Sequence, residues 1–437
     1  MLSPRLMRRN LGFLSNYFSP HLLQLGQPAD GRSKQGRRWK KSSVLLQATL
    51  LALASGCKGL TEAEILTASM SVGSRRQFGI AKRVPDTTLR TFLCKLNPYI
   101  LATMIHVVAY DAWRRKALQH RKDLSFLPFG VLSMDGKYPS VRDVGDSDFL
   151  QVRHDEDGHP THGLVRTVTS CLVSAIGRPL LGATPIRGDT NEQGSFANAF
   201  GEMVQMFGAL FTLVMYDAGA ASQKNADLVI DAKKDYFFQV ADARWTMHQM
   251  MVLLFKDKAH QFSEEKTSGE ERVVRQITVL PVKKTRKNLT MWSHVQAAVR
   301  VYSETYKEGK LTGTKTRYFV TSLPASKFTP QQFLELVILR WGVETVHQIL
   351  DIKSAYEEDR RPWITSDAQG NLNVQLLRRV VFTLTTLYKH VTLRSDENRN
   401  ESWGCYLKRF LSVLQWSTPE LFVGLRRRTY AVPPAML

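Results

Sequence analysis

Cysteine is scarce in this chain of 437 residues, and its cysteines stand far apart. The four are Cys57, Cys94, Cys171 and Cys405, and none belongs to a CxxC pair. Structural zinc sites and the disulfide frameworks of secreted domains both need clustered cysteines. We therefore expect neither kind of site, and the cysteine usage fits a reducing cytoplasm.

Long apolar runs are also missing. A membrane-spanning helix needs roughly 20 consecutive apolar residues. The best candidate, "SVLLQATLLALASG" (residues 43–56), is too short and predicts a buried helix instead. The N-terminus has basic residues, but the apolar core of a signal peptide does not follow them. We expect neither secretion nor a membrane span.

Acidic residues are in the minority, with 39 Asp and Glu against 60 Lys and Arg and a formal charge of +21. This balance favours a polyanionic partner, because Lys and Arg that neutralise phosphates release counterions. Nucleic acid is the leading candidate. A ribosomal protein, a membrane-surface protein and a basic soluble enzyme share this composition and stay open. The 43% apolar content is typical of a globular protein.

The first part of the chain is expected to be basic and helical. Residues 1–42 end in "GRSKQGRRWKK" and predict a basic arm, either solvated or lying on phosphates. Residues 43–125 contain several short helix patterns with their own start and stop signals. These helices are rich in Arg and Lys, which favours a helical DNA-binding domain over an ordinary helical domain.

The hydrophobic period changes at Phe126 and predicts an α/β fold. Strand and helix patterns alternate over residues 126–242, with a hairpin at Gly177-Arg178-Pro179, which favours a mixed sheet with flanking helices. Residues 243–325 are strand-like and predict a β-rich insertion. Residues 326–395 complete the same domain, with one helix that starts after Pro330 and runs through residues 339–359. Residues 396–437 are expected to form a helical basic tail.

Two aspartates follow apolar strand patterns. Asp135 lies in "LSMDGKY" and Asp217 in "VMYDAGAAS". Acids at strand ends commonly project into an exposed site at the edge of a sheet. The alternative for each is a turn-forming aspartate before glycine.

A glutamate on an amphipathic helix completes this set. In "RWGVETVHQILD", the residues Arg340, Glu344, His347 and Asp351 fall within one arc of a helix. An apolar stripe beside them, formed by Leu339, Val343, Val346 and Leu350, is expected to dock the helix on the sheet. Docking would turn Glu344 toward Asp135 and Asp217. Three converging carboxylates can hold two divalent cations through oxygen ligands, which is the arrangement used for phosphodiester transfer.

Asp135, Asp217 and the arginine-tryptophan-x-aliphatic-glutamate core around Glu344 together resemble the DDE transposases of bacterial insertion sequences. The likeness is greatest to the branch with an RNase H-like catalytic domain and a β-strand insertion before the glutamate. It covers about residues 43–390. The family's signature tyrosine and lysine would fall on Val337 and Asp351, so both are missing here. Lys353 points to another face of the helix and is not expected to replace the lysine.

The resemblance implies a function and its residues. Asp135, Asp217 and Glu344 would be the catalytic triad and the ligands of two Mg²⁺ ions, with Mn²⁺ as an alternative. DNA contacts would come from Arg340, which could also orient Glu344, and from His347. The partners would be double-stranded DNA, both transposon ends and target, and a second copy of the chain on that DNA. The location would be the bacterial cytoplasm, associated with the nucleoid.

Several weaker candidates remain. "HDEDGHPTHG" (154–163) gathers histidines and acids, but a polar hairpin loop is the alternative to a metal site. Asn191 is expected to cap a helix, and a Glu or Gln beside it could touch DNA. The remaining predicted DNA contacts are Lys137, Arg272 and Arg275, and the last two could equally form a solvated charged face. Trp245 and Trp292 could stack on an unpaired base or pack in the core.

Transposition is the leading functional prediction, by metal-dependent cleavage of terminal inverted repeats and strand transfer. Two other readings stay open. One is a metal-dependent nuclease or resolvase on the same fold, which would cut without joining. The other is a domesticated DNA-binding protein that has lost its chemistry.

Overall fold

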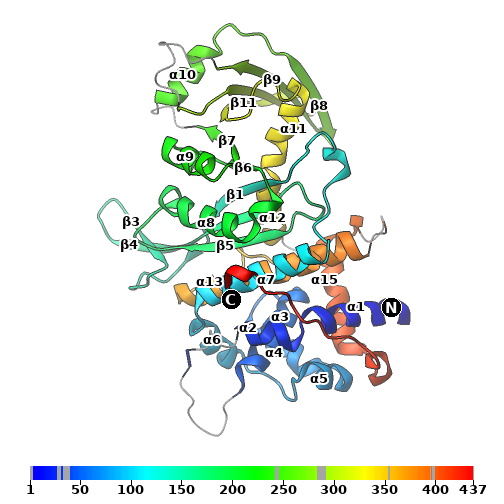
Figure 1. Cartoon of the computed structure of the whole chain (residues 1–437). Helices are drawn as coiled ribbons and strands as arrows, with labels where there is room; N and C mark the ends of the chain where they lie inside the picture. The colour runs from blue at the N-terminus through cyan, green and yellow to red at the C-terminus, as the bar shows by residue number, and fades with distance from the viewer. Residues whose placement is uncertain are drawn as a thin grey trace.

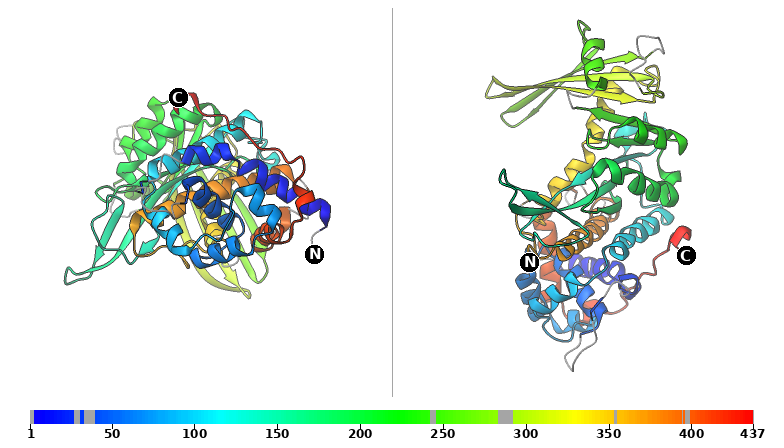
Figure 2. Two further views of the ribbon diagram at one scale, coloured as in Figure 1. Left: turned by 90° about the horizontal axis from the view of Figure 1, so that it is seen from below. Right: turned by 90° about the vertical axis from the view of Figure 1, so that its left-hand side faces the viewer.

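The chain folds as a mixed α/β protein in which one large sheet stands on a layer of helices (Figure 1). The computed structural model describes residues 3–26, 31–32, 40–241, 246–282, 292–352, 355–393, 395 and 399–436. Within this part of the chain, no helix is both long and apolar enough to cross a membrane. Along the molecule, the helical layer comes first and the sheet follows it. The sheet ends in the strands β8–β11 (Figure 2).

The sheet has eleven strands in the order β2-β4-β1-β6-β7-β11-β10-β9-β8, with β3 and β5 also paired to β4. Only β1–β6 and β6–β7 are parallel, and the other pairs are antiparallel. The strands are β1 (Val131–Lys137), β2 (Ser140–Val141), β3 (Leu150–His154), β4 (Pro160–Leu172), β5 (Leu180–Ile186), β6 (Leu213–Tyr216), β7 (Asp235–Val240), β8 (Phe262–Ser268), β9 (Glu271–Pro281), β10 (Ala297–Lys307) and β11 (Lys310–Thr321).

The strands predicted over residues 126–242 are confirmed, and so is the hairpin between β4 and β5. Its turn needs two residues with positive φ, Gly177 at 80° and Arg178 at 48°. Helices α8 (Glu192–Phe207) and α9 (Gln223–Asp231) also lie where the pattern placed them. The helix α10 (Thr246–Leu254) and the edge strand β8 were not predicted.

The predicted β-rich insertion exists, and it continues the central sheet. Strand β11 pairs antiparallel with β7 from Tyr318–Val240 to Thr321–Phe237. Hydrogen bonds therefore run without interruption from β4 to β8. The predicted connection "KKTRKN" lies outside the described residues.

Side-chain alternation along β1 and β6 divides the core between two faces of the sheet. Leu132 and Met134 pack with Phe196 of α8 on one face, while Val131 packs with Val343 on the other. Because the strand period is two, Asp135 shares the second face with Val131. The second face is the one that carries helix α12 (Gly342–Asp351), which contacts β1 and β4.

The helix predicted to run from Pro330 through residues 339–359 is in fact two helices. Helix α11 (Pro330–Arg340) starts with a capping box at Thr329 and stops before Trp341, and α12 then ends at Asp351. Gly342 lets α12 approach the sheet closely, since a Cβ there would lie 2.7 Å from Cγ1 of Val173. The predicted apolar stripe of Leu339, Val343, Val346 and Leu350 is buried.

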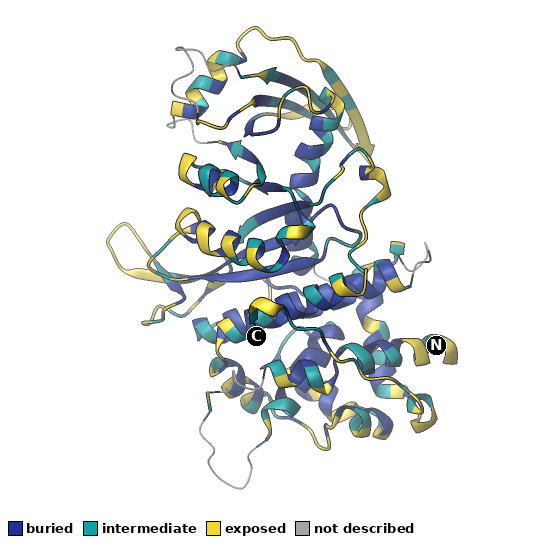
Figure 3. Ribbon diagram, viewed as in Figure 1, coloured by how far each residue is buried: buried dark blue, intermediate teal, exposed yellow. Residues whose placement is uncertain are grey.

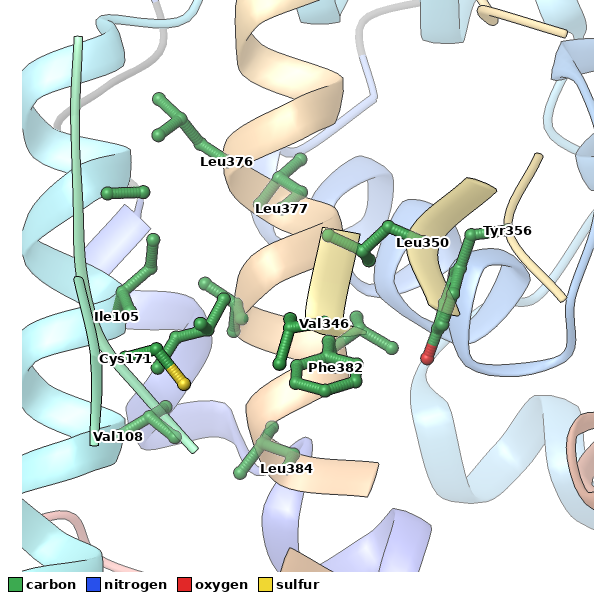
Figure 4. Close-up of a cluster of buried hydrophobic side chains, with 14 of the residues drawn as sticks. Ile105, Val108, Cys171, Val346, Leu350, Tyr356, Leu376, Leu377, Phe382 and Leu384 are labelled. Carbon is green, nitrogen blue, oxygen red and sulfur yellow. The ribbon is translucent and has the colours of Figure 1, made fainter. Parts of the chain in front are cut away.

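Helix α13 (Ala368–Leu387) forms the centre of the helical layer and is buried on all sides (Figure 3). It contacts α3, α6, α7 and strands β4 and β5. Figure 4 shows Val346 and Leu350 of α12 beside Leu377 and Phe382 of α13. The helices of this layer are α1 (Pro4–Tyr17), α2 (Pro20–Gly26), α3 (Ser42–Ala54), α4 (Leu60–Ser69), α5 (Val72–Phe78), α6 (Asp86–Cys94), α7 (Pro98–Arg114) and α15 (Trp403–Trp416).

The expectation for residues 1–42 needs correction, because much of the expected basic arm is helical and packed. Leu11, Phe13 and Leu14 of α1 are buried, and α1 packs against α15. The charged positions of this segment gave it a basic composition, but its apolar residues repeat with helical spacing and drive burial. Residues 27–30 and 33–39 lie outside the described part.

Truncating the core of α13 should destabilise the whole protein. Phe382 is fully buried, so Phe382→Ala should lower the free energy of unfolding by about 3–5 kcal/mol through lost burial and a residual cavity. Trp416→Ala is the matched control, because Trp416 is 74% exposed and should cost only about 0.5 kcal/mol. Urea unfolding followed by fluorescence or circular dichroism measures both. Equal losses would contradict the central place given to α13.

Candidate metal centre

Three carboxylates, those of Asp135, Glu192 and Asp217, meet at the C-terminal ends of the central strands β1 and β6. We call this end of the two strands the edge of the sheet. One oxygen from each lies within 4.8 Å of the others. Asp135 belongs to β1 and Asp217 directly follows β6. These strands are parallel and Ser133 is opposite Met215, so two residues further on the register sets Asp135 beside Asp217. Two of the three predicted ligands are therefore brought together.

Glu192 was not predicted as a member of this group. It lies in the first turn of α8, where the side chain of Asn191 caps the helix as expected. The only signal in the sequence was an acid after a capping residue, and acids are common in first turns simply because they favour the helix dipole. The position of the α8 N-terminus over the edge of the sheet comes from the packing of Phe196 and Phe200, which sequence spacing does not reveal.

The Glu192 carboxyl is held tightly. Its residue is 8% exposed, and Oε2 accepts a hydrogen bond from the Tyr138 hydroxyl. Oε1 is buried and has no hydrogen-bond partner among the described residues. Gly136 and Gly219 make room for this carboxyl, since a Cβ at either would lie within 2.8 Å of it. An unsatisfied buried carboxylate oxygen fits a divalent cation, which prefers oxygen ligands.

Burial and mutual repulsion raise the pKa of all three acids. Burial, followed by the charge of Glu344, raises the pKa of Asp135 to about 7. Burial, followed by the charge of Asp217, raises the pKa of Glu192 to about 7. For Asp217 the pKa also rises, first through burial and then through Asp135. A bound cation would stabilise the charged forms and reverse these shifts.

Glu344, the third predicted ligand, does not belong to this close group. Its Oε1 accepts a hydrogen bond from Nη2 of Arg340 at 2.8 Å, and its side chain is 41% exposed. It is still close enough for its charge to raise the pKa of both Asp135 and Asp217. Arg340 is thus placed to orient Glu344, one of the two roles predicted for it.

His347 faces the carboxylate cluster, not the solvent. Its Nδ1 lies 3.2 Å from Oδ2 of Asp135, and the ring is buried. Burial, followed by the charge of Arg379, lowers the pKa of His347 to about 3, so the ring is neutral at neutral pH. The geometry places His347 as an orienting partner of Asp135 and leaves it no access to a DNA strand at the surface.

Lys137 is enclosed by acids, which does not favour the DNA contact predicted for it. Nζ lies 2.5 Å from Oδ2 of Asp351 and also bonds to Asp359. Burial by itself lowers the pKa of this lysine, but Glu358, Asp351 and Asp359 together raise it above its ordinary value. Asp351 therefore has its charge compensated within the protein.

A pocket lined by three basic residues (Arg275, Lys315 and Arg317) and two acids (Glu271 and Glu344) adjoins the carboxylate cluster on the side of Glu344, and we call it the basic pocket. It has a volume of about 560 Å³ between α12 and strands β9–β11, and its lining includes Arg275, Arg317, Trp341 and Glu344. The guanidinium carbons of Arg275, Arg317 and Arg340 lie 5.9, 5.0 and 5.8 Å from the Trp341 ring centre. Arg275 was predicted to contact DNA, whereas Arg317 was missed because its strand shows no distinctive motif.

The remaining candidates lie away from this site. Arg272 pairs with Glu265 and stacks over Tyr306, 4.3 Å from the ring centre. Trp292 packs near Tyr236 and Phe238, in agreement with the core alternative. In the 154–163 loop, Asp155, Asp157 and His159 come close together but are all exposed. Trp245 and Lys353 lie outside the described residues.

Removing the Glu192 charge should stabilise the cation-free protein at high pH. The folded carboxyl keeps its proton up to about pH 7, while an unfolded glutamate loses it near 4.5. The unfolded state therefore releases its proton first, and the stability of the parent falls as pH rises through this window. Glu192→Gln escapes this loss and should gain up to about 3 kcal/mol over the parent between pH 5 and pH 8.

Urea unfolding in EDTA at several pH values measures this difference. Glu156→Gln is the control, because Glu156 is exposed and does not belong to this carboxylate group. A flat difference between Glu192→Gln and the parent would contradict the environment described for this carboxyl.

Comparison with known proteins adds no relative. A scan against protein-family models and a search of curated proteins both found no match. Functional assignment therefore depends on the fold and on the geometry of the metal centre and the basic pocket.

Proposed function

We propose that this protein is a DDE-type transposase that cuts the terminal inverted repeats of a mobile element and joins the freed 3′ ends to target DNA. One observation carries the proposal. The carboxylates of Asp135 and Asp217 converge at the edge of the sheet, within electrostatic reach of Glu344 and beside a basic pocket. Acids that can hold hard cations and arginines that can hold phosphates are the two needs of metal-dependent phosphodiester chemistry.

The strand order supports an RNase H-like catalytic domain. In the spatial order β5-β4-β1-β6-β7, the strands β5, β4 and β1 form an antiparallel meander. The strands β6 and β7 then continue the sheet parallel to β1. The acids stand on the two central strands, and the β-rich insertion comes between Asp217 and Glu344 in the chain. These features match the branch of transposases that the sequence resembles.

Asp135 and Asp217 would bind the cations, with Glu344 as the further predicted ligand. Two Mg²⁺ ions at such a site activate the attacking oxygen and stabilise the leaving one. The chain's own contribution is orientation and charge. His347 holds Asp135, Arg340 holds Glu344, and the low exposure of Asp135 and Asp217 keeps bulk water from screening them.

The basic pocket would hold the phosphates of the DNA strand that enters the site. Arg275 comes from β9 and Arg317 from β11 of the insertion, and Glu344 lines the same pocket. Burial, followed by the charge of Arg340, lowers the pKa of Arg317, which reflects crowding of like charges. A bound phosphate would relieve this repulsion. Two DNA ends must be held together for transposition, so we propose a dimer on DNA.

Metal-dependent cleavage and joining would test the proposal directly. The purified chain is incubated with DNA that carries the flanking ends of its gene and Mg²⁺, and 3′-end nicks and strand-transfer products are separated on gels. Asp217→Ala and Glu344→Ala should each lose at least about 100-fold in cleavage, because a lost ligand removes transition-state stabilisation. Glu156→Gln should cleave like the parent.

Each other result has a meaning. Cleavage without joining would favour the nuclease reading, and DNA binding without cleavage would favour a non-catalytic DNA-binding protein. If Asp217→Ala cleaves as well as the parent, or if EDTA has no effect, the metal-dependent mechanism is wrong.

Arg317→Gln should weaken DNA binding without removing sequence preference. Loss of one phosphate contact should lower affinity about tenfold at moderate salt and reduce the slope of log affinity against log salt by about one. Lys233→Gln is the control of equal charge, because Lys233 precedes β7 and so lies at the opposite edge of the sheet from Asp217. Fluorescence anisotropy over a salt series measures both, and equal slopes would argue against the pocket as the phosphate site.

A further inference from the structure

The geometry points to Glu192, and not Glu344, as the third ligand that completes a cation site with Asp135 and Asp217 in the DNA-free protein. This inference rests on the proposed function for the identity of the cation as a divalent metal. One cation would bind to Asp135, Glu192 and Asp217 before DNA arrives. Glu344 would become a ligand only in a later step.

Glu192 is already in place for ligation. One of its oxygens lies within 4.8 Å of an oxygen from each aspartate, and its Oε1 is buried without a partner in the described part of the chain. The Tyr216 hydroxyl is fully buried beside the same carboxyl and lowers the pKa of Glu192 as a nearby hydrogen-bond donor, although the two groups are not well aligned. A buried carboxylate oxygen with one poorly aligned neighbour still has room for a further polar partner. A cation with its bound water would supply it.

The other Glu192 oxygen shows how the carboxyl is kept in position. Oε2 accepts from Tyr138, and Asn191 fixes the first turn of α8 through a 2.8 Å hydrogen bond to the Gly194 amide. The side chain therefore reaches the aspartates without a conformational change. Preorganised ligands bind more tightly because little ordering remains to be done.

Glu344, unlike Glu192, already has a cationic partner, which is Arg340. It is the carboxylate bonded to Arg340, whose side chain is 4% exposed and whose Nε and Nη1 have no partner among the described residues. Moving Glu344 to a cation would break its 2.8 Å hydrogen bond to Arg340 and leave a third nitrogen of this buried guanidinium without a partner, which is unfavourable. Glu344 is therefore expected to stay with Arg340 until another anion reaches that guanidinium.

The basic pocket offers a route for that anion. Arg340 is close enough for its charge to lower the pKa of Arg317, and Glu344, which is bonded to Arg340, lines the same pocket as Arg317. A DNA phosphate in the pocket would give Arg340 a new counter-charge and free Glu344 to bind a cation. Metal affinity should then depend on Glu192 without DNA and on both glutamates with DNA.

Manganese binding to the full-length protein tests this directly. Free Mn²⁺ is measured by electron paramagnetic resonance during titration, first without DNA. Glu192→Gln should lower the affinity at least about tenfold, because it removes one charged ligand. Glu344→Gln should change it less than about threefold, and Glu156→Gln should not change it. Glu192→Asp, which keeps the charge but shortens the side chain, should recover part of the lost affinity.

Several outcomes would overturn the inference. Glu344→Gln could lower DNA-free binding as much as Glu192→Gln, Glu192→Gln could bind like the parent, or the parent could bind no Mn²⁺ at millimolar concentration. Circular dichroism and urea unfolding verify that each variant is folded. If the parent cleaves DNA while Glu192→Gln binds Mn²⁺ normally, this inference fails and the proposed function stands. If binding follows Glu192 but the parent never cleaves DNA, the proposed function fails and the cation site stands.

Discussion

The parallel pairing of β1 with β6 is the constraint on which the rest of the site depends. It fixes Asp135 and Asp217 side by side at the end of two buried strands, where their charges repel. Glu192 and Glu344 add to this repulsion, whereas other neighbouring features reduce its cost. Protons are retained to higher pH, His347 contacts one acid, and the cationic Arg340 lies near both. The arrangement is costly for a protein with no cation and favourable for one that binds it.

Packing of the buried helices holds the residues around Asp135 and Asp217 in place despite the repulsion between these two acids. Helix α12 is fixed to the sheet by its apolar stripe and to α13 by contacts such as Val346 with Phe382. Behind it, Arg379 bonds to Glu358 at 2.7 Å, both fully buried, and Lys137 joins Asp351. The side of α12 that carries His347 is therefore set in a rigid layer, while Glu344 stands on the side that opens to the pocket.

The sequence predicted the fold class, most strands and the two aspartates, because these depend on local patterns. Apolar residues define β1 and β6, and an acid lies at the C-terminal end of each. Because the C-terminal ends of parallel strands meet at the same side of a sheet, the two acids are predicted to lie close together. Glu192 and Arg317 were out of reach, because their roles arise from the contact of segments far apart in the chain. The break at Trp341 was missed for a similar reason, since helical spacing continues across it and the close approach of Gly342 to Val173 joins segments far apart in the chain.

The other correction concerns composition. Residues 1–42 were expected to be an arm because their charge was counted without the periodicity of their apolar residues. In α1, the buried side of the helix lies against α15, which comes from the opposite end of the chain. The contact between α1 and α15 joins segments near opposite ends of the chain. A short stretch of sequence therefore cannot predict it.

The pairing of β11 with β7 has a mechanical consequence. Both walls of the basic pocket are attached to one hydrogen-bonded sheet, the first through α12 on β1 and the second as strands β9–β11. The two walls are therefore linked through β1, β6, β7 and β11 of that sheet. If the proposed DNA strand enters this pocket and the sheet keeps its shape, the cost of distortion would fall on the nucleic acid. Sequences that bend or unstack easily would then enter more readily than stiff ones.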